Sequence, residues 1–150
     1  MNDDRDPPPI HAFAPPLRTH IRPVSTAGSP PPAGHYAQAV VHDGTVYVAG
    51  ILPWDPDDID APIGDTEQQA RRVMQSLAAV LEAAGSGLDR LLSVTVFVAD
   101  LSDWGTVNEV FAEVLGDHRP ARAVVPVLPL KRGAALELTA VAAVPAVSAP

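Results

Sequence analysis

The chain has no cysteine and only one lysine among its 150 residues. The missing thiols exclude disulfide bonds, thiolate metal sites and a cysteine nucleophile. Because lysines and arginines together number 10, the single Lys131 stands beside nine arginines. So few cations do not form the basic stripe with which proteins follow a phosphate backbone. An arginine in an apolar setting therefore stands out as a candidate for a specific role.

Basic charge is also scarce relative to acidic charge. The formal net charge is −8 and the isoelectric point is about 4.8, which weighs against nucleic acid or an anionic membrane as the main partner. The N-terminus has no apolar signal core, and no hydrophobic run is long enough to span a bilayer. We therefore expect a cytoplasmic protein, and the 47% of hydrophobic residues suits a single domain with a real core.

Proline is unevenly distributed along the chain. Nine of the 17 prolines lie in residues 1–32, where they fix backbone angles and remove hydrogen-bond donors. This composition predicts an extended arm over 1–32, which is either a disordered leader or a segment that packs on a neighbouring subunit. We expect the folded domain over 33–145 and a flexible tail over 146–150.

Hydrophobic periodicity predicts five strands and two helices. A hairpin is expected around Asp43-Gly44, and the first helix is expected to begin at an Asp65 cap and end at Gly85. Asp103 is a candidate cap for the second helix. The expected strands are 37–41, 45–49, 91–99, 121–127 and 135–143. The resulting order ββαβαββ predicts an α+β fold, with a mixed sheet and both helices packed on one face.

Two opposite charges lie in apolar strand-like segments. Arg122 precedes a run of small and apolar residues, and Glu137 lies in a similar run fifteen positions later. Long charged side chains are rarely buried without a partner or a function. The two could form a structural ion pair. Alternatively, both could face one cleft, where the arginine fork would bind a carboxylate and the glutamate would hold a water or move a proton.

Other candidate residues carry weaker signals. The five histidines show no metal-ligand spacing, so we expect no metal site. Tyr36 precedes the first hairpin strand, where its phenol either contacts a polar ligand or packs half-buried at the strand edge. Asn108 lies inside the second predicted helix, where asparagine is a poor helix former. This misfit permits a functional role for Asn108 without requiring one.

With Gly34-His35-Tyr36, Pro120-Ala121-Arg122 and Leu136-Glu137-Leu138 in this order and spacing, the chain resembles the Rid/YjgF family of reactive-intermediate deaminases over about residues 33–143. The resemblance rests on short blocks in their order and spacing, above all a glutamate fifteen residues after Pro-Ala-Arg. These blocks are Gly34-His35-Tyr36-Ala37-Gln38, Val48-Ala49-Gly50-Ile51-Leu52-Pro53, Gln69 with its helix, Ala83-Ala84-Gly85, Val94 to Asp100, Val107-Asn108, Pro120-Ala121-Arg122 and Leu136-Glu137-Leu138.

The resemblance implies a chorismate-mutase-like fold and a homotrimer whose clefts lie between neighbouring subunits. It implies hydrolysis of enamine and imine intermediates, such as 2-aminoacrylate, to 2-keto acids and ammonia. By position, Arg122 would bind the substrate carboxylate, and Glu137 would position the attacking water or relay its proton. Tyr36, Gly50 and Asn108 would line or shape the site. The family chemistry needs no metal or organic cofactor.

Three positions depart from the usual family pattern. Ala49 and Ile51 flank Gly50 where the family usually has Ser-Gly-Gln, and Val124 stands where a cysteine or another small polar residue is common. With Val124 among the substrate-binding positions, the pocket is less polar than usual, which predicts a larger or more apolar imine. The alternative is a non-catalytic trimer that binds a small carboxylate or a protein partner.

Overall fold

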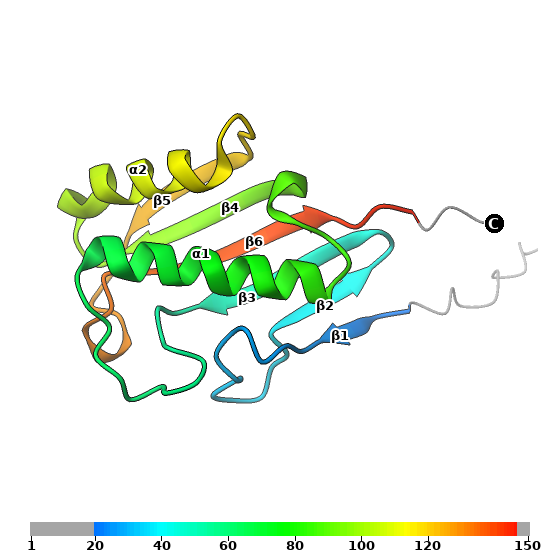
Figure 1. The fold of residues 1–150 in the computed structure, drawn as a ribbon, viewed down its shortest axis with the longest axis horizontal. Helices are drawn as coiled ribbons and strands as arrows, with labels where there is room; N and C mark the ends of the chain where they lie inside the picture. Colours follow the sequence, from blue (N-terminus) through cyan, green and yellow to red (C-terminus); the bar gives the residue numbers. More distant parts are fainter. Residues whose placement is uncertain (1–19, 147–150) are drawn as a thin grey trace, which may run out of the picture.

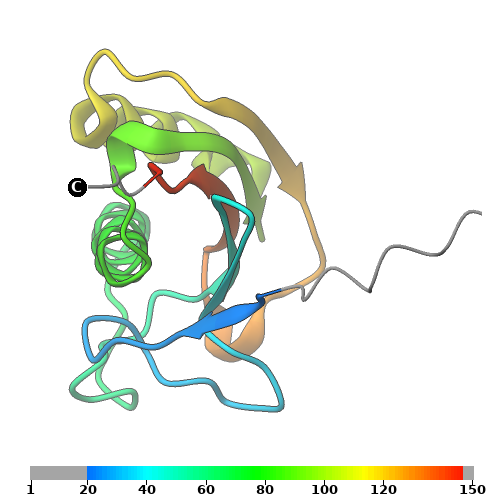
Figure 2. The same cartoon turned by 90° about the vertical axis from the view of Figure 1, so that its right-hand side faces the viewer.

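The computed structural model describes residues 20–146, which form one six-stranded sheet with two long helices on one face (Figures 1 and 2). The strand order is β1-β2-β3-β6-β4-β5. Only the β4–β5 pair is parallel, and the other neighbouring pairs are antiparallel. The predicted α+β fold with a mixed sheet is therefore confirmed. The strands are β1 (Arg22–Val24), β2 (Ala39–His42), β3 (Thr45–Ile51), β4 (Leu91–Val98), β5 (Ala121–Pro126) and β6 (Leu136–Ala143).

The long helices are α1 (Thr66–Ala83) and α2 (Trp104–Leu115), and three short 3-10 helices connect other elements. The beginning of α1 has the predicted cap: the Asp65 carboxylate accepts a hydrogen bond from the Gln68 backbone N–H at 2.9 Å. Its end at Gly85, with φ of 83°, has the two backbone hydrogen bonds of a Schellman motif. The short helices are η1 (Leu88–Arg90), η2 (Leu101–Asp103) and η3 (Lys131–Gly133).

The predicted hairpin is also confirmed. Asp43 and Gly44 both have positive φ, as the tight turn between two twisted strands requires, and His42 pairs with Thr45. Asp103 lies at the N-cap position of α2, as predicted, but its side chain makes no capping hydrogen bond to the helix. Its carboxylate instead accepts a hydrogen bond from the Thr66 hydroxyl at 3.0 Å, which ties the beginnings of the two helices together.

The sheet has one strand more than the predicted order. β1 lies within the stretch 1–32 that we expected to be an arm, and its three residues pair antiparallel with β2. So short a strand carries no hydrophobic periodicity, and Pro23 is tolerated because β1 is an edge strand. Residues 1–19 of the predicted arm and 147–150 of the predicted tail lie outside the described residues.

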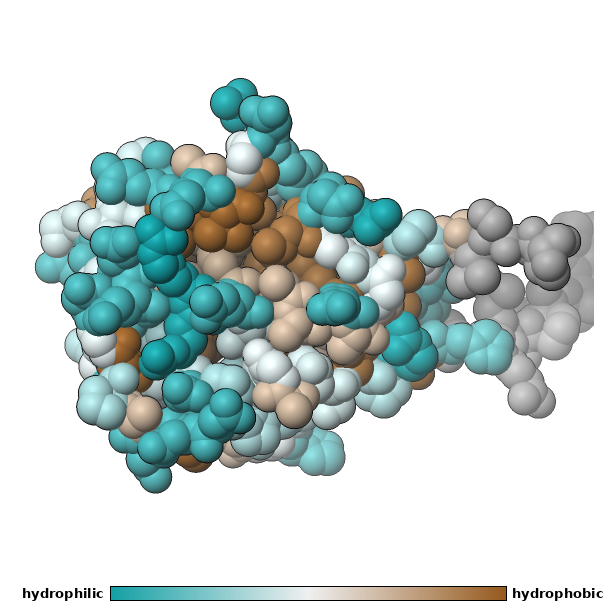
Figure 3. All heavy atoms as spheres, viewed as in Figure 1, coloured by the Kyte–Doolittle hydropathy of each residue, from teal (hydrophilic) through white to brown (hydrophobic). Residues whose placement is uncertain are grey.

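The core lies between the helices and one face of the sheet. Alternate residues of the central strands point to the helices, including Val94, Val96 and Val98 of β4. On the helix-bearing face, hydrophilic residues predominate, and hydrophobic residues are visible between α2 and α1 (Figure 3). Within residues 20–146, no helix is long and apolar enough to cross a membrane. The opposite sheet face has no helix over it (Figure 2), and Tyr47 there is 49% exposed.

Candidate functional site

Arg122 and Glu137 lie on opposite faces of the sheet. Arg122 pairs with Val94 of β4, whose side chain is buried against the helices. Glu137 pairs with Phe97, which has the opposite orientation because successive side chains of a strand alternate. Paired residues share a face, so the two charges do not meet within one chain. Among residues 20–146 the ion pairs include no Arg122–Glu137 contact, and both the predicted ion pair and the predicted shared cleft are wrong for a single chain.

Glu137 lies directly over Gly50 on the face without helices. β3 has one residue more than β6 between the pairs Val48–Ala140 and Ile51–Leu138, and this bulge contains Gly50. A Cβ at Gly50 would collide with the Glu137 carboxylate, so any side chain at this position would displace the carboxylate. Glu137 is half-buried, and this burial raises the pKa of its carboxyl group above the usual range.

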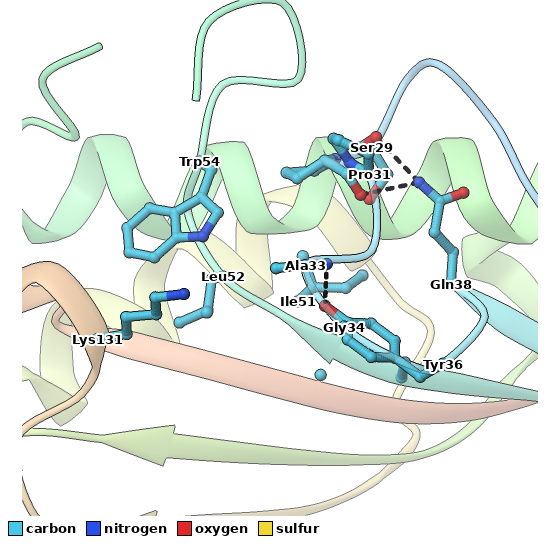
Figure 4. Close-up of a pocket in the computed structure, with 13 residues that line it drawn as sticks. Ser29, Pro31, Ala33, Gly34, Tyr36, Gln38, Ile51, Leu52, Trp54 and Lys131 are labelled. Atoms are coloured by element: carbon cyan, nitrogen blue, oxygen red, sulfur yellow. Dashed lines mark hydrogen bonds between the residues drawn. The ribbon is translucent and has the colours of Figure 1, made fainter. Parts of the chain in front are cut away.

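A pocket of about 260 Å³ begins at Gly50 and extends along the end of β3 (Figure 4). We call it the Tyr36 pocket. Its lining is mainly apolar, with Ile51, Leu52 and Trp54 on the β3 side. Tyr36, which is 52% exposed, forms part of the opposite side, and its hydroxyl accepts a hydrogen bond from the Ala33 backbone N–H at 3.0 Å. The phenol keeps its own proton free to donate to a ligand.

One wall of the Tyr36 pocket is a loop of the proline-rich segment, and Gln38 stabilises this loop. Its side-chain amide donates hydrogen bonds to the backbone carbonyls of Ser29 and Pro30, at 3.0 and 2.9 Å. The same amide donates to the Thr26 carbonyl at 3.1 Å, and its oxygen accepts from the Thr26 N–H at 2.7 Å. This buried side chain therefore satisfies the backbone groups of a loop that the prolines leave without regular pairing.

The other end of the Tyr36 pocket is held by residues of η3. The Arg132 guanidinium stacks on Trp54 at 4.9 Å from the ring centroid. Arg132 also donates a hydrogen bond to the Ile59 carbonyl and lies 3.5 Å from the Asp60 carboxylate. These contacts fix the loop after β3 against η3. Beside them, the Lys131 side chain extends across this end of the pocket below Trp54 (Figure 4).

Arg122 is held on the helix-bearing face by three residues of α2. Its guanidinium donates a hydrogen bond to the Asn108 side-chain oxygen at 2.8 Å. It also lies 5.3 Å from the ring centroid of Phe111 and 5.9 Å from that of Trp104. Trp104, Asn108 and Phe111 follow the i, i+4, i+7 spacing of one helix face. A second pocket, of about 400 Å³, adjoins this cluster and also contains Arg119.

The site therefore consists of two separate parts in one chain. The Glu137 half-site comprises Glu137, Gly50 and the Tyr36 pocket, and the Arg122 half-site comprises Arg122, Asn108, Trp104 and Phe111. The bidentate face of an arginine suits a carboxylate, whereas a half-buried carboxyl group with a raised pKa suits proton transfer. Within the described residues, no three His, Cys, Asp or Glu side chains form a metal-binding group.

Comparison with known proteins places the chain in a family. A family model described as endoribonuclease L-PSP matches residues 26–144. The RutC family protein UK114 of Drosophila melanogaster is 42% identical over 119 residues, covering 79% of this chain and 86% of that protein. Human 2-iminobutanoate/2-iminopropanoate deaminase is 35% identical over 121 residues, covering 81% and 88%. The chain belongs to the Rid/YjgF family.

Solved structures of Rid/YjgF proteins have the same fold. RidA from an Antarctic Psychrobacter matches with a TM-score of 0.77 at 35% identity, covering 81% of this chain and 98% of that chain. Escherichia coli TdcF with bound serine also matches with a TM-score of 0.77, at 31% identity and with the same coverage of 81% and 98%. The family resemblance drawn from the short sequence blocks is confirmed.

The structure divides the predicted site residues between the two half-sites. It brings Tyr36, Gly50 and Glu137 to one, and Arg122 and Asn108 to the other. Val124 shares the face of Arg122 but packs half-buried against the core. Sequence reasoning missed Gln38, Trp54, Lys131 and Arg132. Lys131 could have been found in the sequence, because it is the only lysine of the chain. Gln38 could not, because its contacts depend on the irregular loop before β2.

Proposed function

We propose that the protein hydrolyses reactive enamine and imine intermediates to 2-keto acids and ammonia. The observation that carries this proposal is the Glu137 carboxyl group, half-buried over Gly50 with a pKa raised by burial and without an ion pair among residues 20–146. Such a group is suited to accept a proton from water and to return it. Relatives 35% identical to the chain are named 2-iminobutanoate/2-iminopropanoate deaminase, which supports the same chemistry.

The proposed reaction is the addition of water to a carbon–nitrogen double bond. Glu137 takes a proton from the attacking water as the water oxygen bonds to the imine carbon, and passes this proton to the nitrogen as the C=N π bond breaks. Glu137 then moves the hydroxyl proton of the carbinolamine to the amine, the C–N bond breaks and the carbonyl forms, so imine and water become keto acid and ammonia. The imine carbon is already electrophilic, so orientation and proton transfer supply the catalysis and no cofactor is required.

Arg122 binds the substrate carboxylate in this proposal, and Asn108 orients its guanidinium. Because Arg122 and Glu137 lie on opposite sheet faces of one chain, the complete site requires the Arg122 half-site of one subunit and the Glu137 half-site of a neighbour. A homotrimer with clefts between its subunits would meet this requirement. The sheet face without helices supports assembly, since it exposes apolar side chains such as Tyr47 and Val125.

The substrate is proposed to be larger or more apolar than 2-aminoacrylate. Ala49 and Ile51 line the Tyr36 pocket on both sides of Gly50, and Trp54 adds an aromatic wall. Val124 adds no polar group beside Arg122. An apolar substrate side chain would bury against these residues, at about 25 cal/mol for each Å² removed from water.

The first experiment measures turnover directly. A pyridoxal-phosphate dehydratase or an amino-acid oxidase generates the imine, and release of keto acid is timed with wild type and with buffer. We expect acceleration by wild type and loss of it in Glu137→Gln. If wild type binds 2-keto acids but accelerates none of a series of imines, the protein is instead a trimeric carboxylate binder and the deaminase proposal fails.

The second experiment tests whether the half-sites come from different subunits. Arg122→Ala and Glu137→Gln chains are unfolded together and refolded as mixed oligomers. If each cleft combines two subunits, about a quarter of the clefts regain both functional residues, and about that share of wild-type activity returns. Separately refolded variants are the control. A mixture as inactive as the separate variants would contradict a shared cleft.

The description of the matching family model as an endoribonuclease suggests a second activity to test. The net charge of −8 does not favour binding to RNA phosphates. We expect no cleavage of single-stranded RNA by the same preparation that hydrolyses imines. Cleavage that disappears in Glu137→Gln would contradict this expectation, because it would assign the carboxylate to phosphodiester chemistry.

A further inference from the structure

Lys131 is the only ionised side chain among the residues that line the Tyr36 pocket. Two other polar side chains there, Gln38 and Tyr36, already have partners within the chain. Gln38 is fully occupied by the loop carbonyls and by the Thr26 N–H, and the Tyr36 oxygen accepts from Ala33. The Lys131 ammonium, by contrast, forms no ion pair within residues 20–146.

The neighbouring cation is not available to a ligand in the same way. Arg132 is occupied by Trp54, the Ile59 carbonyl and Asp60, and it positions the aromatic wall of the pocket. Lys131 therefore places a free positive charge at one end of a mainly apolar pocket, whose other boundary includes Gly50 under the Glu137 carboxylate. A lysine ammonium on a flexible stem binds a carboxylate as a point charge.

We propose, on the basis of the function proposed above, that Lys131 binds a second anionic group of the substrate. The substrate class is then the imine of an amino acid whose side chain is a hydrocarbon chain with a terminal carboxylate. Its imine carbon lies beside Glu137, its side chain runs along Ile51, Leu52 and Trp54, and its terminal carboxylate meets the Lys131 ammonium. Arg122 of a neighbouring subunit remains the partner of the carboxylate next to the imine.

Norleucine and 2-aminoadipate provide a matched pair of probes, because their side chains have equal length and end in a methyl group and a carboxylate respectively. An amino-acid oxidase generates the imine of each, and kcat/KM for keto-acid release is measured with wild type, Lys131→Met and Lys131→Arg. Lys131→Met removes the charge and keeps an apolar stem. Arg90→Met is the control, since it removes an exposed cation that lines no pocket described above.

We expect wild type to prefer the 2-aminoadipate imine, and Lys131→Met to lower this preference about five- to tenfold, as expected for loss of one charge-assisted contact. Lys131→Arg retains most of the preference, and Arg90→Met leaves it unchanged. Equal kcat/KM for the two imines in wild type, or the same preference in Lys131→Met, overturns the proposal.

Ligand binding separates this proposal from the proposed function. The keto acids 2-oxoadipate and 2-oxohexanoate are titrated calorimetrically into wild type and Lys131→Met. If neither imine is hydrolysed, yet 2-oxoadipate binds more tightly and only in the presence of Lys131, the deaminase function fails while the role of Lys131 stands. If both imines are hydrolysed but the two keto acids bind equally well, the role of Lys131 fails and the deaminase function stands.

Discussion

The Glu137 half-site and the Arg122 half-site differ in burial, in neighbours and in the chemistry they permit. Glu137 lies half-buried over a glycine at a strand bulge, and desolvation raises its pKa. Arg122 lies exposed on the edge strand β5, and an amide and two aromatic rings of α2 surround its guanidinium. The first environment favours proton transfer, whereas the second favours binding of an anion.

In the proposed function, the Arg122 half-site binds the substrate and the Glu137 half-site performs the chemistry, so the reaction needs two chains. The sheet separates the two charges, so neither neutralises the other, and Glu137 keeps a raised pKa that a nearby guanidinium would lower. A cleft between neighbouring subunits would place both residues around one substrate. Changes in the Glu137 half-site should therefore reduce the rate of the chemical step, and changes in the Arg122 half-site should mainly weaken binding.

The largest effect is expected for Glu137→Gln. The substitution preserves the size of the side chain and removes the group that accepts the proton, so kcat should fall by about 10²- to 10⁴-fold. Steady-state kinetics of imine hydrolysis measures the loss, and Glu82→Gln, which changes an exposed glutamate on α1, is the control. A change in KM at constant kcat would contradict the assignment of proton transfer to this half-site.

A smaller but still large effect is expected for Gly50→Ala. The added Cβ would collide with the Glu137 carboxylate and displace it, so kcat should fall by about ten- to a hundredfold through lost proton transfer. Gly105→Ala is the matched control, because a Cβ there meets no atom within 4 Å. Equal activity of the two alanine variants would show that the position of Glu137 does not matter for the rate.

A third and smaller effect, on substrate binding, is expected in the Arg122 half-site. Arg122→Lys keeps the charge but loses the planar fork, so we expect KM to rise about tenfold with a smaller change in kcat. Michaelis constants for one imine in wild type and variant measure it. Arg90→Lys makes the same chemical change at an exposed arginine that lines no pocket described above, and should have little effect. A fall in kcat as large as that of Glu137→Gln would mean that the half-sites do not divide binding and chemistry.

Local sequence patterns were sufficient to predict the helices and most strands. They were insufficient to predict that Arg122 and Glu137 lie on opposite faces of the sheet. The Asp65 cap, the Asp43-Gly44 turn and the apolar stripes of α1 and α2 are signals within a few neighbouring residues, and the structure contains each of these elements. Alternation along a strand also shows which residues share a face with Arg122. Alternation does not show whether Arg122 and Glu137, which lie in different strands, share one face of the sheet.

The relation between the two faces depends on long-range pairing. β6 lies between β3 and β4, and β5 is added in parallel beyond β4. The register of these pairs determines that Arg122 faces the helices and Glu137 does not. No local sequence pattern predicts this register. Family resemblance was the only indication in the sequence of the proposed site between two subunits. β1 was missed for a local reason, since three residues that include a proline have no measurable period.

The smallest expected effect concerns stability, and it tests the raised pKa of Glu137 without any substrate. Burial raises this pKa above its usual value near 4.5, so the folded state holds the proton to higher pH than the unfolded state. The stability of wild type therefore falls as pH rises through the window above 4.5. Glu137→Gln lacks this titration, and its free energy of unfolding relative to wild type should increase over the same window.

Glu113→Gln provides a comparison of opposite sign. Hydrogen bonding to Arg71, at 2.7 Å, lowers the pKa of the Glu113 carboxyl group, so its contribution to stability is present above the usual glutamate pKa and is lost as pH falls. Its glutamine variant should lose stability relative to wild type as pH rises. The loss should be slight, because the Glu113 side chain is well exposed. Urea unfolding at several pH values measures both variants. Parallel pH trends in the two would contradict a desolvated Glu137, and would remove the physical basis for assigning proton transfer to that half-site.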